Sequence, residues 1–166
     1  MKIILSVLAF VCMILPARVL EPYEDLPWPK HDERIGKLTA YFKKHNCPQL
    51  TYVKTYISTA DKYNLPFELL PAISMQEQQC GKVVAYCRPP NRQPYPANNH
   101  WGWNSAAYPK GCFNSAEEGI ETVAKALATA PVYAGKTLER KLSTYNSVNP
   151  DYVGEIKQHM ININQK

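Results

Sequence analysis

Apolar residues recur every three or four positions along much of the chain, which is the spacing of one face of an α-helix. The first such stripe follows Asp32, which can cap a helix, and ends at Cys47. The second starts at Thr51 and is broken by Asn64 and Pro66. The stripes consist of Ile35, Leu38 and Phe42 in the first and of Val53, Tyr56, Ile57, Ala60 and Tyr63 in the second. Both predict amphipathic helices that face a core.

A third helical segment opens after Pro66 and runs through Glu77 as far as Gly81. Its apolar residues are Leu69, Leu70, Ala72 and Ile73. Pro71 lies inside the segment, and a proline is tolerated at the first position of a helix but kinks a helix further in. The sequence therefore leaves two possibilities open, a helix that starts at Pro71 and a kinked helix that starts near Phe67.

Residues 81–113 differ in character, because Pro, Asn, Gly and aromatic residues dominate them and no helical stripe runs through them. Within them the run N-N-H-W-G-W predicts a loop or a short hairpin. Ser115 with Glu118 forms a capping-box pattern that opens a helix, and two more helices follow, the last capped by Asn149 and Pro150. The apolar residues of these three helices are Ile120, Val123, Ala124 and Leu127, then Leu138, Leu142 and Tyr145, then Tyr152, Val153, Ile156 and Met160. The expected fold class is mainly α, with a small irregular or β-hairpin segment.

The first 20 residues are typical of a signal peptide. A lysine at position 2 is followed by an apolar run over residues 3–15, which is shorter than the roughly 20 apolar residues that span a bilayer. A permanent membrane anchor is therefore the weaker interpretation. Residues 21–30 hold three prolines and predict an exposed lead-in, and residues 31–166 are expected to form one domain. The protein is accordingly expected to be exported, to a periplasm or out of the cell.

Four cysteines remain after the predicted signal peptide, and an even number in an exported chain predicts two disulfides. A zinc site is disfavoured, because only Cys80 and Cys87 are close in sequence and no nearby histidine completes a ligand set. The two helices before Cys80 are joined by a short connection and should pack as an antiparallel hairpin. That geometry brings Cys47 next to Cys80 and leaves Cys87 to pair with Cys112. The closed loops would hold about 34 and 26 residues, and each would stabilise the fold by about 3 to 4 kcal/mol.

The formal net charge is +5, and the basic residues are spread along the chain instead of forming a block. Nucleic acid is therefore not expected as a partner. A mild positive balance suits an anionic polymer such as a cell wall, because attraction to carboxylates raises the encounter rate.

Glu77 stands at the end of an otherwise apolar helical segment. Burial and the partial negative charge of a helix C-terminus both raise the pKa of a carboxyl group. A raised pKa is what a general acid needs to protonate a glycosidic oxygen near neutral pH. An isolated glutamate in the last turn of a helix is more often a solvated residue than a buried acid. The neighbouring motifs decide between these two interpretations of Glu77.

Four motifs occur in order along the chain: L-P-F-E-L-L-P-A-I-S-M-Q-E-Q-Q-C-G at 65–81, N-N-H-W-G-W at 98–103, S-A-E-E-G-I at 115–120, and Y-N at 145–146 with P-D-Y-V after it. Over about residues 51–163 the chain resembles the lysozyme-like superfamily, in particular the soluble lytic transglycosylase and glucosaminidase-like domains of bacteria. The resemblance implies a lysozyme-like helical domain whose irregular segment lines the cleft. It further implies that Glu77 is the catalytic acid, that 99–103 belongs to the substrate cleft, and that Tyr145 and Asn146 lie beside Glu77. Tyr145 is the second expected catalytic residue, whose hydroxyl would orient the carboxyl group or the substrate.

Several side chains in and after the irregular segment are candidates for binding sugar. The aromatic residues could stack on sugar rings or simply hold a loop together, and the asparagines could bind acetamido groups, although turn formation is their commoner role. The aromatic candidates are Tyr95, Trp101, Trp103 and Tyr108, and the expected substrate-binding set is Asn98, Asn99, Trp101, Gly102, Trp103 and Asn146. No cofactor and no metal are expected, and the four scattered histidines are assigned no catalytic role.

The type of reaction depends on a second carboxylate, since hydrolysis by two acids requires a partner at roughly 5 to 9.5 Å. The candidates are Asp61, Glu68, Glu117, Glu118 and Asp151, none of which has a motif of its own. A mechanism with Glu77 alone is therefore expected. As the resemblance implies, Glu77 protonates the leaving oxygen and the muramyl C6 hydroxyl then attacks, giving a 1,6-anhydro product.

The expected function is thus cleavage of the MurNAc-GlcNAc β-1,4 bond in peptidoglycan glycan strands by a monomeric lytic transglycosylase. Gln78 stands where the family usually has serine, and Trp101-Gly102-Trp103 replaces a common Leu-Met-Gln run, so the reaction product stays open. The alternatives are a hydrolytic lysozyme or glucosaminidase and a catalytically idle cell-wall-binding domain. A secreted inhibitor or toxin is disfavoured, because such chains are usually shorter and denser in cysteine.

Overall fold

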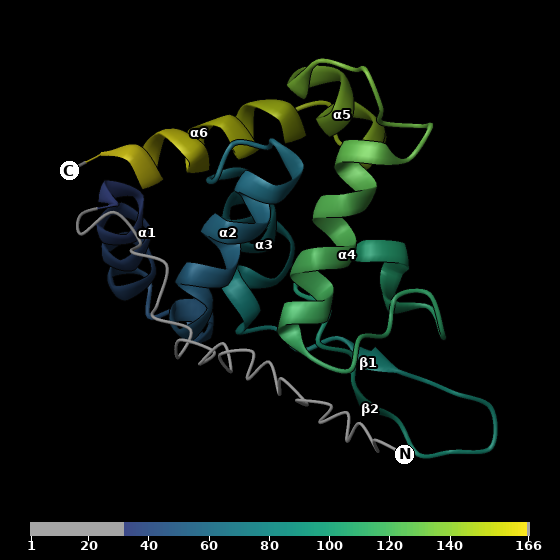
Figure 1. The fold of residues 1–166 in the computed structure, drawn as a ribbon. Helices are drawn as coiled ribbons and strands as arrows, with labels where there is room; N and C mark the ends of the chain where they lie inside the picture. The colour runs from purple at the N-terminus through teal and green to yellow at the C-terminus, as the bar shows by residue number, and fades with distance from the viewer. Residues whose placement is uncertain (1–31, 166) are drawn as a thin grey trace, which may run out of the picture. The chain divides into compact units, whose positions relative to one another are not determined.

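The computed structural model describes residues 32–165. The predicted signal peptide, 1–20, and the predicted lead-in, 21–30, lie outside the described residues. From Asp32 onward the chain forms one compact unit that is mainly helical, as predicted. Its α-helices are α1 (Glu33–Lys44), α2 (Val53–Tyr63), α3 (Leu69–Gln78), α4 (Ala116–Thr129), α5 (Leu138–Tyr145) and α6 (Tyr152–Asn164) (Figure 1).

The first two helices begin and end at residues suited to helix termini. Asp32 caps α1 as predicted, and its carboxylate accepts a hydrogen bond of 3.0 Å from the backbone N–H of Arg34. Helix α2 ends where Asn64 adopts a left-handed conformation with φ of 50°. It starts two residues later than predicted, because the 3₁₀ helix η1 (Pro48–Tyr52) precedes it.

The sequence left two starting points open for helix α3, at Pro71 itself or near Phe67 with a kink. Both are wrong. The helix starts at Leu69, so Pro71 occupies its third position. The first backbone N–H groups of a helix have no partner inside it, so the missing N–H of Pro71 costs no hydrogen bond there and no kink is needed. Every residue from Leu69 to Ser74 is buried, which makes α3 the central helix of the unit.

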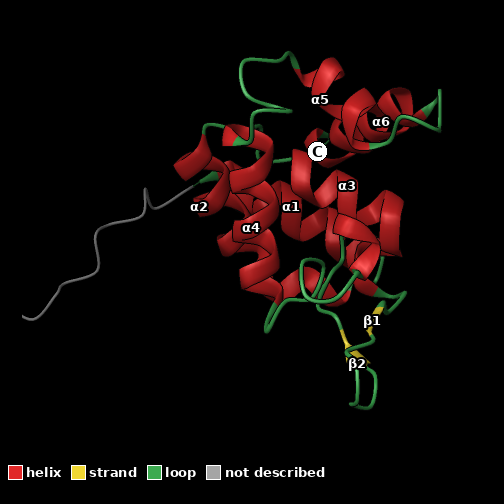
Figure 2. Ribbon diagram, turned by 90° about the vertical axis from the view of Figure 1, so that its right-hand side faces the viewer, coloured by secondary structure: helices red, strands yellow, loops and turns green. Residues whose placement is uncertain are grey.

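The irregular segment contains a two-stranded antiparallel hairpin, β1 (Tyr86–Cys87) and β2 (Tyr95–Pro96). This hairpin comes before the N-N-H-W-G-W run, whereas the sequence predicted a loop or hairpin at the run itself. The run is a loop that ends in the short 3₁₀ helix η3 (Trp103–Ala106). In Figures 1 and 2 the hairpin projects from the helices at the end away from α5 and α6.

The capping box before α4 forms in part. The Ser115 side chain accepts a hydrogen bond from the backbone N–H of Glu118, as predicted, but the Glu118 carboxylate turns to the backbone N–H of Asn114. The last helix, α6, starts at Tyr152, and Asn149 does not cap it. Asn149 instead accepts from the backbone N–H of Asp151 in the turn before the helix.

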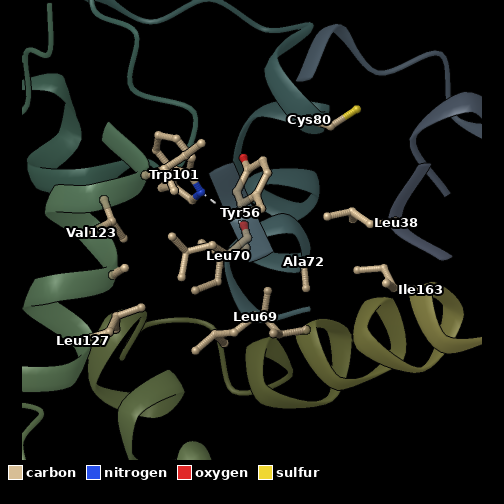
Figure 3. Packing of buried hydrophobic residues seen from close by; sticks show 14 of the residues in the cluster. Leu38, Tyr56, Leu69, Leu70, Ala72, Cys80, Trp101, Val123, Leu127 and Ile163 are labelled. Atoms are coloured by element: carbon tan, nitrogen blue, oxygen red, sulfur yellow. Dashed lines mark hydrogen bonds between the residues drawn. The ribbon is translucent and has the colours of Figure 1, made fainter. Parts of the chain in front are cut away.

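The core surrounds α3 on several sides. Figure 3 shows its apolar side chains between those of α4 on one side and those of α1 and α6 on the other. The labelled residues of this core are Leu38, Tyr56, Leu69, Leu70, Ala72, Cys80, Trp101, Val123, Leu127 and Ile163. Trp101 extends from the irregular segment into the core. Its indole N–H donates to the backbone carbonyl of Leu70 at 3.1 Å. The chain that carries the candidate site is therefore anchored directly on the central helix.

Two disulfides brace the two ends of the irregular segment. Cys47 pairs with Cys80 and Cys87 pairs with Cys112, which are the pairs predicted from the helical hairpin. The first joins the chain before α2 to the chain just after α3, three residues beyond Glu77. In the part of the chain that the structure describes, no helix is long and apolar enough to cross a membrane.

Candidate functional site

Glu77 lies half-buried in the last turn of α3, where α6 packs antiparallel to that helix. At this end of the pair, the Tyr152 hydroxyl donates to Oε1 of Glu77 at 2.8 Å. One turn further along α6, Glu155 accepts hydrogen bonds from Gln76 at 2.8 Å and from Asn149 at 2.9 Å. These bonds hold α6 in register against the end of α3, so the Glu77 carboxyl group has a defined direction.

The protonation of Glu77 follows from its surroundings. Burial raises the pKa of its carboxyl group above the usual value, and the hydrogen bond from Tyr152 opposes that rise. The predicted direction of the shift is therefore confirmed, with burial as its main cause. Burial and the nearby Glu77 charge hold the pKa of Tyr152 far above its usual range, so Tyr152 stays a neutral hydroxyl donor.

Gly102 lies close to the other oxygen of Glu77. Its φ of 62° lies in the left-handed region, and a Cβ atom there would stand only 2.5 Å from Oε2 of Glu77. A side chain at position 102 would collide with the carboxyl group. Glycine is therefore favoured for two independent reasons, backbone conformation and close approach.

A pocket of about 280 Å³ opens beside Gly102. Gly102 belongs to its lining, so the Glu77 carboxyl group adjoins the pocket through that residue. The other lining residues are Trp103, Asn104, Ser105, Tyr133 and Tyr145. The Trp103 ring lies 5.8 Å from that of Tyr145 and 6.3 Å from that of Tyr133. The pocket thus combines aromatic faces with a neighbouring acid, which suits the binding of a polar ring with apolar faces.

Tyr145 lies near Glu77 but makes no hydrogen bond to it: burial, and after it the Glu77 charge, raise the pKa of the Tyr145 hydroxyl. Its hydroxyl donates to the backbone carbonyl of Trp101 at 2.5 Å. Its ring stacks on that of Tyr152, with centroids 6.1 Å apart and planes 6° from parallel. Tyr152 at the start of α6 contacts both residues, through its ring with Tyr145 and through its hydroxyl with Glu77. Tyr145 therefore packs on Tyr152 and lines the pocket, while Tyr152 is the hydrogen-bond partner of Glu77 that the sequence analysis missed, although P-D-Y-V was in the motif set.

Asn99 and Trp101 are structural, not substrate-binding as predicted. Asn99 is buried, and its amide accepts from the backbone N–H groups of Trp101 and Trp103 and donates to the carbonyls of Trp103 and Gly111. Trp101 has no exposed surface. Asn99 therefore has no free hydrogen-bonding capacity for a sugar, and it braces the loop that ends in η3.

The other predicted asparagines also serve turns. Asn98 has φ of 48° and donates to the Phe113 carbonyl at 3.1 Å, so its turn-forming role is the one observed. Asn146 accepts from the backbone N–H groups of Val148 and Asn149, which closes the turn between α5 and α6. Neither lines the pocket. Of the predicted substrate-binding set, only Gly102 and Trp103 do so.

Tyr133 joins the pocket from the loop after α4, and no sequence pattern pointed to it. Two backbone carbonyls at this bend, those of Leu127 and Tyr133, accept hydrogen bonds from the Lys141 ammonium at 2.5 and 2.9 Å. Lys141 thus ties α5 to the end of α4 and holds Tyr133 in place. These contacts join positions 14 and 8 residues apart across a loop, so the spacing of three or four residues along one helix does not reveal them.

The predicted candidates for a second carboxylate are not in the pocket lining. Asp61 pairs with Arg34, Glu68 bonds to Asn164, and Glu118 bonds to Asn114. Glu117 and Asp151 are exposed. The nearest relevant acid on α6 is Glu155, whose carboxylate already accepts from two amides. Glu77 does not line the pocket either, but it lies against Gly102, which does.

We expect Tyr152→Phe to raise the pKa of Glu77 further, because the hydroxyl bond that opposes the effect of burial is lost. The measurement is an NMR titration of the Glu77 carboxyl carbon. Tyr145→Phe is the matched control, since its hydroxyl bonds to Trp101 and should leave the Glu77 titration in place. A Glu77 pKa that stays constant or falls in Tyr152→Phe would contradict the assignment.

Between residues 32 and 165, no cluster of three His, Cys, Asp or Glu side chains is arranged to hold a metal ion. Comparison of the chain with models of protein families, with curated proteins and with solved structures found no match.

Proposed function

We propose that this protein cleaves peptidoglycan glycan strands at the MurNAc-GlcNAc β-1,4 bond, as a lysozyme-like enzyme of the lytic transglycosylase kind with Glu77 as the general acid. One observation carries the proposal: a half-buried carboxyl group with a raised pKa lies against Gly102 at the edge of a pocket with aromatic walls. A raised pKa favours the protonated carboxyl group that a general acid needs, and such walls suit a sugar ring. The motif order along the chain supports the same assignment.

The two oxygens of Glu77 have different tasks in this mechanism. Oε1 accepts the Tyr152 hydrogen bond, so the acidic proton belongs on Oε2, which faces Gly102. Oε2 donates that proton to the glycosidic oxygen as the bond between the muramyl C1 and this oxygen breaks. Trp103 and Tyr145 provide faces against which the sugar rings are held.

Glu77 then acts as a base. Its carboxylate removes the proton of the muramyl C6 hydroxyl, and O6 forms a bond to C1 to give the 1,6-anhydro ring. The proton lost in the first step is regained in the second, so no water is consumed and the acid is restored. This sequence needs no second carboxylate, in keeping with a pocket lining that has no acid of its own among the described residues.

Mass spectrometry of fragments from purified peptidoglycan tests the proposal. We expect fragments with 1,6-anhydro ends from the native protein and none from Glu77→Gln. Fragments with reducing ends would establish a hydrolytic lysozyme or glucosaminidase instead. If the folded native protein releases no fragments from peptidoglycan, the alternative of a catalytically idle cell-wall-binding domain is supported instead.

The setting of this activity is also proposed. Two disulfides among the described residues are typical of proteins in an oxidising compartment. Together with the predicted signal peptide, they support an exported enzyme that meets its substrate in a periplasm or outside the cell.

A further inference from the structure

The segment that contains the hairpin has an unusual charge distribution. From Gln78 to Ala116 the sequence has no acidic residue, although the chain has 14 in all. Four basic residues lie in this segment, and all four are exposed: Lys82, Arg88, Arg92 and Lys110. The ion pairs among residues 32–165 involve Arg34, Lys62 and Lys157, and none involves these four. Residues 82–112, called the basic lobe below, therefore present uncompensated positive charge.

The basic lobe also exposes apolar and aromatic side chains. Of the eight large hydrophobic residues that are exposed in the described chain, five belong to it: Val83, Val84, Tyr86, Tyr95 and Tyr108. These five side chains do not anchor the lobe, because the buried residues Cys87 and Trp101 already hold it to the core. A surface that combines tyrosines with cations is suited to a ligand that has both sugar faces and anionic groups.

The basic lobe is continuous with the candidate site. Its residues Gly102–Ser105 line the pocket, and Tyr108 and Lys110 follow within a few residues of them. The disulfide between Cys87 and Cys112 ties the hairpin to the loop that carries this pocket wall. One extended polymer could therefore occupy the pocket and pass along the lobe, which projects beyond the helices (Figure 2).

We propose that the basic lobe binds the carboxylates of the peptide branches of peptidoglycan, while the glycan strand occupies the pocket. This inference rests on the proposed function. The distribution of the charges along the sequence supports it, because single cations at separate positions, instead of a run of adjacent ones, suit carboxylates that occur at intervals on a polymer. A phosphodiester polymer, with a charge on every monomer, would be matched by a denser cluster of cations.

A membrane surface is a poorer match for the same residues. In the hairpin, Tyr86 pairs with Pro96 and Cys87 pairs with Tyr95. Side chains alternate between the two faces of a strand, so Tyr86 and Tyr95 lie on opposite faces. A flat bilayer interface could accept only one of them, whereas a flexible polymer can contact both.

The test measures binding without cleavage, using the full chain with Glu77→Gln. It compares this parent with a variant that also carries K82Q, R88Q, R92Q and K110Q in co-sedimentation with purified peptidoglycan freed of phosphodiester polymers. The control replaces four exposed lysines of α1, α2 and α4 and makes the same change in net charge: K43Q, K44Q, K54Q and K125Q. We expect roughly ten-fold weaker binding for the lobe variant at low salt, from four exposed charge contacts, and parental binding for the control.

A second arm uses peptidoglycan whose carboxyl groups have been converted to amides. There the parent should bind as weakly as the lobe variant. Equal binding of parent and lobe variant to untreated peptidoglycan would overturn the proposal, and so would a difference that persists on the amidated polymer. Binding only to phosphodiester-bearing walls or to anionic phospholipid vesicles would overturn it in favour of those ligands. The binding assay needs no turnover. A negative result for the basic lobe is therefore distinguishable from a failure of the native protein to cleave peptidoglycan.

Discussion

Glu77→Gln should fold like the native chain and lose roughly 10² to 10⁴ in the rate of peptidoglycan cleavage. The amide is nearly isosteric and can still accept the Tyr152 hydrogen bond at Oε1, but it cannot donate an acidic proton from the position of Oε2. The rate is measured from the release of soluble fragments, with circular dichroism to verify the fold. Native turnover by a folded Glu77→Gln would remove Glu77 from the mechanism.

The same variant should gain stability at neutral pH, which separates loss of the acid from loss of the fold. The pKa of Glu77 is raised in the folded state, so the folded state holds this proton more tightly than the unfolded chain does. The contribution of this proton to the free energy of unfolding is fully present below the ordinary pKa of glutamate, about 4.3. It is lost as the pH rises through the pKa of Glu77 in the folded state. Glu77→Gln should therefore melt at a higher temperature than the native protein at pH 7, and this advantage should shrink towards pH 4.

Gly102→Ala should lower the cleavage rate about 100-fold while leaving the chain folded. The new Cβ would stand 2.5 Å from Oε2 and 3.2 Å from Cδ of Glu77, and the flexible end of that side chain is what can move away. A displacement of about 1 Å in a catalytic group can cost about 10² in rate. The measurement is cleavage rate together with thermal unfolding.

Gly135→Ala is the matched control for this substitution. Gly135 has φ of 70°, in the same left-handed region as Gly102, but a Cβ there would meet nothing within 4 Å. Both substitutions carry the backbone cost of about 1 to 2 kcal/mol for a non-glycine residue in this region. Only Gly102→Ala should reduce cleavage. If both lose activity alike, backbone strain rather than contact with Glu77 is the cause; if neither does, Gly102 does not position the acid.

The sequence by itself determined the features that depend on neighbours within one or two helical turns. The caps at Asp32 and Ser115 form because a side-chain oxygen reaches a backbone N–H two or three residues away. The disulfide pairs followed from a short connection that forces two consecutive helices to run antiparallel. The partial burial of Glu77 followed in the same way, since an acid in the last turn of an apolar helix is drawn partly out of solvent with that helix.

Only the tertiary structure decided which side chains complete the site. Tyr152 meets Glu77 across 75 positions of sequence, and α6 has to dock on α3 before either residue has the other as a partner. Of the two tryptophans in the irregular segment, Trp101 enters the core and Trp103 faces the pocket, because the four hydrogen bonds of Asn99 set the direction of the chain between them. The periodicity of apolar residues in the sequence shows which face of a helix is turned towards the core. The rotation of a loop depends on long-range contacts, which leave no repeating pattern in the sequence.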